Sequence, residues 1–362
     1  MLKRIPEDLQ IGLVAALFNA CSSEKPVSTS GSLVGSAASG ITITTLSTQA
    51  WLVTGGDALV QVSLTAGLDL AQLKVRLNDV DVTAEFKQTS PLQIQALLTS
   101  LPEGDSTLTA SLGTAVDIET LALTNYPISG PIISGRHEQP FACQTGEFEL
   151  VSGGILGSQL DSDCSVLTRV DYVYWSDSES TFKTYRRSPT GEPPEDMGEI
   201  TGPDGNAMAY IVRVETGTVN RAIYEIAMLH DPAAGQVGPW NRSSGWNGKL
   251  VYTHGGGCRS GWFQQGNRTG GVMRRGLFEQ GYAVTSSTLN VFGQNCNDLL
   301  ASETHIMVKE RFIERYGVPD YTIATGASGV SYPLQTPIPV HGTAKCYIHH
   351  PKISIRRISP KP

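Results

Sequence analysis

A serine between small residues, in the stretch Gly326-Ala327-Ser328-Gly329, follows the short apolar segment 321–325. Small neighbours permit the sharp turn from strand to helix that presents a serine hydroxyl as a nucleophile. The backbone N–H of Gly329, directly after the serine, would then face the oxyanion of an acyl intermediate. The stretch therefore predicts acyl-transfer chemistry, with Ser328 as the nucleophile and Gly329 in the oxyanion hole.

A second glycine-rich stretch, His254-Gly255-Gly256-Gly257, follows another short apolar segment, residues 249–253. Without Cβ atoms, glycines let successive peptide N–H groups point into a site. We expect Gly255 and Gly256 to contribute to the same oxyanion hole. Glycine-rich turns are common, so the prediction depends on both stretches occurring in this order, each after its own strand, about 70 residues apart.

The segments that position these residues alternate between strand and helix patterns. A helix is expected from an N-cap at Ser302 to Tyr316, with Gly317 ending it. Strand, strand, helix and strand in this order are typical of an α/β domain with a mostly parallel sheet, which we assign to residues 240–329. The three strands are expected at 249–253, 282–286 and 321–325.

The chain before residue 240 is rich in strand patterns instead. Residues 41–127 alternate apolar and polar side chains between frequent turns, which predicts an all-β sandwich of immunoglobulin-like type. Its role would be structural, or alternatively the binding of a glycan or a protein partner. Residues 128–239 form a strand-rich connecting region, with strands at 171–175, 210–214 and 222–228, the last two joined as a hairpin through 215–218.

The N-terminal residues have the features of an export signal. Lys3 and Arg4 precede the apolar run 11–18, which is too short to span a membrane, and Ala20-Cys21 resembles a bacterial lipoprotein cleavage site. We therefore expect a signal peptide at 1–21 and a Ser- and Gly-rich flexible linker at 22–40. The protein would be exported, either anchored in the periplasm or outer membrane through a lipid on Cys21, or secreted.

Composition excludes some partners and constrains the cysteines. The chain has 362 residues and a net charge of −7, so no basic surface for nucleic acid is expected. In an exported protein, Cys143/Cys164 and Cys258/Cys296 are plausible disulfides, which leaves Cys346 without a partner. No cysteine pair has C-x-x-C spacing, so neither a metal nor another cofactor is predicted.

Longer stretches carry a family resemblance. "NGKLVYTHGGGC", "GYAVTSSTLN", "KERFIERYGVP" and "YTIATGASG" resemble the first half of an α/β-hydrolase domain. Together with "PISGPIISGRHEQPFACQT", they are similar to exported bacterial hydrolases of an uncharacterised family, distantly related to tannases and to 3-hydroxybutyrate-oligomer hydrolases. The resemblance covers about residues 41–329 and implies hydrolysis of a small-molecule carboxylic ester through an acyl-enzyme. Tannases have a cysteine where this chain has Ala327.

A triad of the expected kind is not complete in this chain. Its order would be serine, acid, histidine, but no Asp or Glu follows Ser328, although three histidines do. Before the serine, we expect His254 to be structural and His305 to be packed or solvent-facing on its helix. Asp298 is expected to be an acid of the loop before that helix, and Glu303 an acid of its first turn, both favoured by the helix dipole. The three histidines that follow the serine are His341, His349 and His350.

Residues 330–362 differ from the rest of the chain. They contain six prolines and five Lys or Arg residues but no acid, and Val330 stands where the serine turn favours a small residue. We interpret them as an aberrant tail that follows a change of reading frame after Gly329. The α/β-hydrolase domain would then be incomplete, and the chain a truncated serine esterase without activity.

Two other functions fit the same sequence. The chain could be a non-catalytic exported surface protein that binds a partner or glycan through residues 41–127. Alternatively, it could be an active esterase that takes its acid and histidine from elsewhere in the chain.

Overall fold

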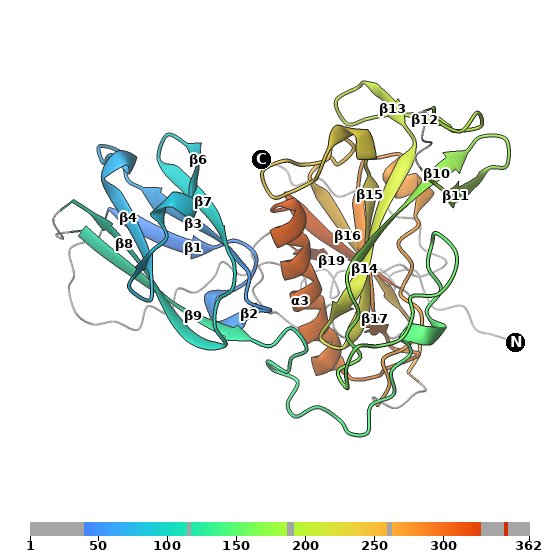
Figure 1. The fold of residues 1–362 in the computed structure, drawn as a ribbon, viewed down its shortest axis with the longest axis horizontal. Helices are drawn as coiled ribbons and strands as arrows, with labels where there is room; N and C mark the ends of the chain where they lie inside the picture. The colour runs from blue at the N-terminus through green and yellow to red at the C-terminus, as the bar shows by residue number, and fades with distance from the viewer. Residues whose placement is uncertain (1–39, 114–116, 187–191, 259–262, 327–343, 347–362) are drawn as a thin grey trace, which may run out of the picture.

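The computed structural model describes residues 40–113, 117–186, 192–258, 263–326 and, for the backbone only, 344–346. The predicted signal peptide, most of the linker, Ser328, Gly329 and most of the tail lie outside these residues. In the described part, two sheets near the N-terminus pack on one side of a long helix, and an eight-stranded sheet packs on its other side (Figure 1).

The two N-terminal sheets share one apolar core. In β3 (Ala58–Leu64), Val60, Val62 and Leu64 face this core as the alternation predicts. Both sheets contribute to it, so residues 41–126 form a β-sandwich; their strand order does not establish an immunoglobulin-like topology. One sheet has the order β1 (Ile41–Thr45), β3, β7 (Gln93–Leu98), β6 (Lys87–Ser90), and the other β2 (Val53–Thr54), β9 (Asp117–Tyr126), β8 (Gly104–Leu112), β4 (Leu73–Leu77), β5 (Val80–Asp81).

The eight-stranded sheet is mixed. β16 pairs in parallel with β17 and β18, whereas β15 pairs antiparallel with both β14 and β17. Its order is β11 (Thr181–Thr184), β10 (Arg169–Ser176), β14 (Ile211–Val219), β15 (Ala222–Leu229), β17 (Ala283–Val291), β16 (Lys249–Gly255), β18 (Tyr321–Thr325), β19 (Ala344–Cys346). A separate hairpin joins β12 (Glu199–Thr201) and β13 (Ala207–Ala209).

The predicted fold class, an immunoglobulin-like sandwich followed by an incomplete α/β-hydrolase domain, is therefore wrong. The described chain is mostly strand, and its α-helices are only the short α2 (Arg275–Phe278) and the long α3 (Asp298–Tyr316). The prediction failed because antiparallel strands from the supposed connecting region belong to the same sheet as the strands after residue 240. Short 3-10 helices lie at Ala50–Leu52, Leu70–Gln72, Thr83–Glu85, Thr145–Glu147 and Pro232–Ala234.

The predicted hairpin between β14 and β15 is present, but its turn lies further along the chain. Asn220 and Arg221 form the turn with φ angles of 53° and 61°. Two-residue hairpin turns of this kind require positive φ at both positions, for which Asn is well suited. Residues 215–218, where the turn was expected, continue β14 instead.

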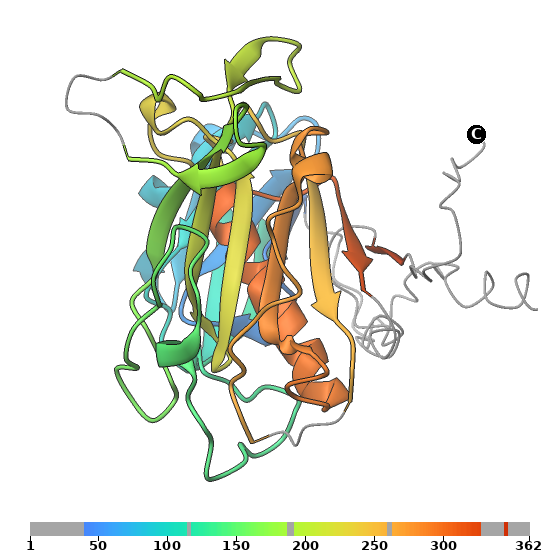
Figure 2. The ribbon, with the colours of Figure 1, turned by 90° about the vertical axis from the view of Figure 1, so that its right-hand side faces the viewer.

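Helix α3 begins five residues earlier than predicted and ends where predicted. Asn297, not Ser302, is the N-cap, because its side chain accepts a hydrogen bond from the N–H of Leu300; Gly317 is the C-cap. In Figure 2 the eight-stranded sheet faces the viewer, with α3 and the N-terminal sheets behind it. In the described residues, no helix has the length and apolar character needed to cross a bilayer.

Both sides of α3 are anchored. Phe312 packs in the cluster that includes Tyr252 and Tyr224 of the eight-stranded sheet. On the other side, the carboxylate of Glu310 accepts hydrogen bonds from the N–H and the hydroxyl of Thr54 in β2. The helix therefore fixes the sandwich against the sheet that carries both glycine-rich stretches.

Candidate functional site

The two predicted motifs follow neighbouring parallel strands, β16 and β18, and therefore lie at the same end of these strands, their carboxyl end. Thr253 of β16 is the register partner of Thr325 of β18, and these strands run parallel. We call residues 254–257 the glycine loop. This loop and the chain that continues from Thr325 toward Ser328 therefore start side by side. Ser328 and Gly329 themselves lie outside the described residues.

The carbonyl groups of the glycine loop have an unusual arrangement. In a regular strand, successive carbonyls point to opposite sides. Here the carbonyls of both Gly255 and Gly256 accept hydrogen bonds from the chain that follows β17, namely from the N–H groups of Phe292 and Gly293, each at 2.9 Å. Since each trans peptide directs its N–H opposite to its carbonyl, the N–H groups of Gly256 and Gly257 both point away from β17. β18 flanks β16 on that other side.

Two of these glycines are required by close packing. A Cβ atom on Gly257, whose φ is +119°, would lie 2.5 Å from the Cα of Gly293. A Cβ atom on Gly255 would lie 2.6 Å from a methyl carbon of Val291. Because neither position has room for a side chain, the close contact between the glycine loop and the end of β17 depends on glycine.

The predicted disulfide Cys258–Cys296 is confirmed, and it holds this loop in place. Cys258 directly follows Gly257, and Cys296 directly precedes the N-cap of α3. Their Cα atoms are 5.0 Å apart. The bond therefore ties the glycine loop to the turn between β17 and α3, at the same edge of the sheet.

His254 and His305 are packed against each other beneath the glycine loop. Nδ1 of His305 is 3.3 Å from Nε2 of His254, and both rings stack with Tyr252. Burial lowers the pKa of His254 to about 4, although the backbone of Thr325 and Tyr252 acts in the opposite direction. Burial, together with His254 and Lys309, also lowers the pKa of His305 well below its usual value. His305 is therefore packed rather than solvent-facing, and both rings are neutral at pH 7.

Glu303 has a role that its sequence position does not reveal. One of its carboxylate oxygens accepts hydrogen bonds from the N–H groups of Ile132, Ile133 and Ser134, and the other accepts the Ser134 hydroxyl. It anchors the segment after β9 to α3. Asp298, expected in the loop before the helix, lies in the first turn of α3 instead.

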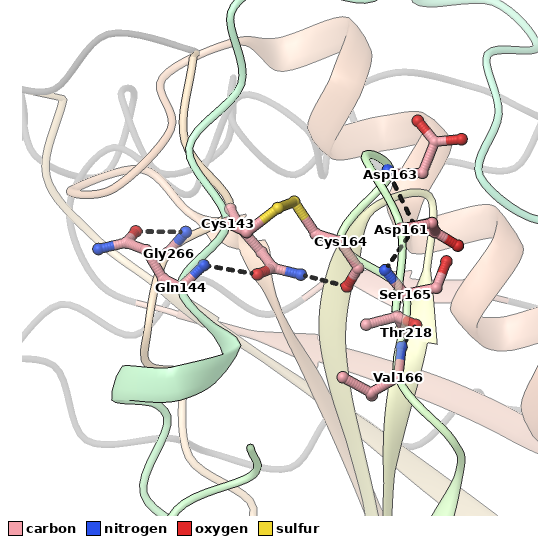
Figure 3. The surroundings of a disulfide bond; sticks show 10 residues. Cys143, Gln144, Asp161, Asp163, Cys164, Ser165, Val166, Thr218 and Gly266 are labelled. Atoms are coloured by element: carbon pink, nitrogen blue, oxygen red, sulfur yellow. Dashed lines mark hydrogen bonds between the residues drawn. A yellow bond between two sulfur atoms is a disulfide. The ribbon is translucent and has the colours of Figure 1, made fainter. Parts of the chain in front are cut away.

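The second predicted disulfide, Cys143–Cys164, is also confirmed and stabilises the loops beside the site. The amide side chains of Gln144 and Gln265 connect the bonded segments, since Gly266 N–H donates to Gln144 and Gln144 N–H donates to Gln265. The side chain of Gln265 also donates to the carbonyl of Cys164. Figure 3 shows this network around the sulfur atoms.

The described residues contain no group of three or more His, Cys, Asp or Glu side chains placed to hold a metal ion. Comparison with known proteins gives one family. The model of a tannase-like family of unknown function matches residues 43–338. No curated protein matches the chain significantly. The match includes the sandwich, the glycine loop and Ser328.

Proposed function

Because the chain belongs to the tannase-like family of unknown function, we propose that it is a carboxylic-ester hydrolase with its site at the shared edge of β16 and β18. The hydroxyl oxygen of Ser328 attacks the ester carbonyl carbon, and the alcohol leaves with a proton as the acyl-enzyme forms. Water then attacks the acyl group, which releases the acid and restores the serine.

The orientation of the glycine loop is the observation that carries this proposal. The N–H groups of Gly256 and Gly257 both point away from β17 because the carbonyls of Gly255 and Gly256 are held by Phe292 and Gly293. Two fixed N–H donors on one side can stabilise an oxyanion, which contributes about 3–4 kcal/mol per donor in known enzymes. In this proposal, Gly255 orients the first donor peptide, and Gly329 adds a further N–H.

The register of the strands supports the position of the nucleophile. Thr325 is adjacent to Thr253, and Ser328 follows Thr325 by three residues. The glycine loop and the serine turn can therefore contact the same ester group without any change in the pairing of β16 with β18. The disulfide at Cys258 limits the movement of the donor loop, as preorganised electrostatic stabilisation requires.

We propose that turnover by this 362-residue chain is slow. Burial lowers the pKa of both His254 and His305, which makes them weak bases, and in the described structure they contact each other rather than a carboxylate. Residues 329–362 contain no Asp or Glu. An oxyanion hole and substrate binding without a complete triad still accelerate acyl transfer about 10³–10⁴-fold over water. An activated ester should therefore acylate the serine, while release of the acid is slow.

Release of p-nitrophenolate from p-nitrophenyl butyrate tests this function. The wild type should give a burst of about one equivalent followed by a slow phase, because acylation precedes a slow hydrolysis step. Ser328→Ala should lack the burst, and Ser158→Ala, which changes an exposed serine, should retain it. An equal burst in Ser328→Ala, or none in the wild type, would show that Ser328 is not the nucleophile. Rapid steady turnover that depends on Ser328 would disprove the slow second step.

A further inference from the structure

A second candidate site lies on the sheet face that is turned away from α3. Neighbouring side chains of a strand point to opposite faces, and Tyr224 of β15 packs toward α3. Glu225 therefore faces the other way, where it lines a surface hollow of about 470 Å³. Its side chain is almost fully buried at the base of this hollow, with 5% of the residue exposed.

The carboxyl group of Glu225 has one partner that leaves room for another. The hydroxyl of Thr269 donates to Oε2 at 2.5 Å. No ion pair of Glu225 is found among the described residues, and burial raises its pKa to about 7. Near neutral pH this group can therefore either accept a hydrogen bond or, when protonated, donate one.

The rim of the hollow contains charges of both signs. Arg268 and Arg274 supply donors, and Glu147 and Glu149 supply acceptors. Asn267 adds an amide that can do both. Phe148, Val151, Val272 and Met273 contribute apolar surface between these groups.

A ligand with a single charge would be attracted by groups of one sign and opposed by groups of the other. The groups opposing an anion are Glu147, Glu149 and Glu225, and those opposing a cation are Arg268 and Arg274. A neutral ligand with many hydroxyl groups can donate to the carboxylates, accept from the guanidinium groups and place C–H surface on the apolar side chains. We propose that the hollow over Glu225 is a binding site for a neutral sugar.

The hollow reaches toward the glycine loop. A Cβ atom built on Gly293 would lie 3.8 Å from Nη2 of Arg268, and Gly293 donates to the carbonyl of Gly256. The rim of the hollow therefore lies beside the chain that holds the carbonyl groups of the loop, on the side opposite the proposed donor N–H groups. Sugar binding itself does not depend on Ser328, so it stands or fails separately from the proposed hydrolysis.

Saturation-transfer NMR with the full chain tests the proposal, with D-glucose, D-galactose and D-mannose as neutral probes. At least one should bind, and glucuronate and glucosamine should bind at least fivefold more weakly. Glu225→Leu and the rim variant Arg268→Ala should each reduce the neutral-sugar signal at least fivefold. Glu103→Gln, in an exposed turn of the sandwich, should retain it.

Arg268 is exposed, so its variant tests the rim even if Glu225→Leu fails to fold. The proposal is wrong if none of the three neutral sugars binds the folded wild type, or if a charged sugar binds more tightly than all of them. It is also wrong if Arg268→Ala binds the neutral sugar as the wild type does. A Ser328→Ala variant should bind the sugar normally, which separates this test from that of the hydrolase.

Discussion

Thr253, two residues before the end of β16, and Thr325, the last residue of β18, are register partners in two neighbouring parallel strands. From these two residues the chain enters the two stretches that the sequence marks as chemical, the glycine loop and the serine turn. They lie far apart in the sequence, but the parallel pairing of β16 with β18 brings their ends together. The proposed hydrolase site depends on this pair.

Gly257→Ala should destabilise the fold and abolish acylation. Its φ of +119° and a 2.5 Å approach to Gly293 leave no room for a methyl group, and strain of this kind costs about 2 kcal/mol or more. Urea denaturation and the p-nitrophenolate burst measure both effects. Gly276→Ala is the matched control, because a Cβ there would meet nothing within 4 Å and alanine favours a helix. If Gly257→Ala behaves like Gly276→Ala, the loop is not packed as described.

Removal of the Cys258–Cys296 bond should impair acylation more than removal of Cys143–Cys164. The two bonds close loops of 38 and 21 residues, so each double serine variant should lose about 3–4 kcal/mol of stability. Only the first bond directly follows the glycine loop. The burst rates of the two double variants, measured under conditions in which both are folded, show which disulfide matters more for acylation. Equal burst rates would mean that the first bond does not hold the donor peptides.

Glu303→Gln should lower stability by about 2–3 kcal/mol, because its carboxylate accepts three backbone N–H groups and a hydroxyl. A glutamine side chain would direct an NH₂ group or only one acceptor at these donors. Asp298→Asn, at an exposed position in the first turn of the same helix, should cost less than about 1 kcal/mol. Urea denaturation compares them, and similar losses for both variants would contradict the anchoring role of Glu303.

Glu225 should make stability depend on pH. Burial raises its pKa from 4.5 to about 7, so its contribution is fully present below pH 4.5 and is lost as the pH rises through 7. The loss is on the order of 3 kcal/mol. Other charged groups line the same hollow, namely Arg268, Arg274, Glu147 and Glu149. Because the wild type and Glu225→Gln both contain them, their effect cancels when the two proteins are compared.

The free energy of unfolding of the wild type should therefore fall between pH 5 and pH 8 relative to that of Glu225→Gln. Urea denaturation of both proteins at each pH gives this difference. A constant difference across the range would show that the Glu225 carboxyl group titrates normally.

Local patterns predicted some elements well. The strand Tyr321–Thr325 has the predicted bounds, Gly317 ends the helix as expected, and both cysteine pairs are bonded. The strand and the helix end are each determined by residues close together in the sequence. The disulfides were predictable because few pairings of the cysteines are possible. The glycine loop was also found from sequence, although the direction of its peptides is set by Phe292 and Gly293, which the pattern does not include.

The sequence did not predict features that depend on distant partners. Glu303 and Glu225 look like surface acids in the sequence, yet the first is buried by residues about 170 positions away and the second by the segment around Thr269. The fold class was wrong for the same reason. The strand-and-helix alternation after residue 240 does not reveal that β15 pairs antiparallel with β17.

The most direct test of the central claim is the site of acylation. The full chain is treated with p-nitrophenyl acetate, quenched in acid and mapped by peptide mass spectrometry. We predict a single acetyl group on Ser328, absent from Ser328→Ala and strongly reduced in Gly257→Ala among the folded molecules. Acetylation spread over lysines or other serines, with Ser328 unmodified, would contradict the proposed hydrolase site.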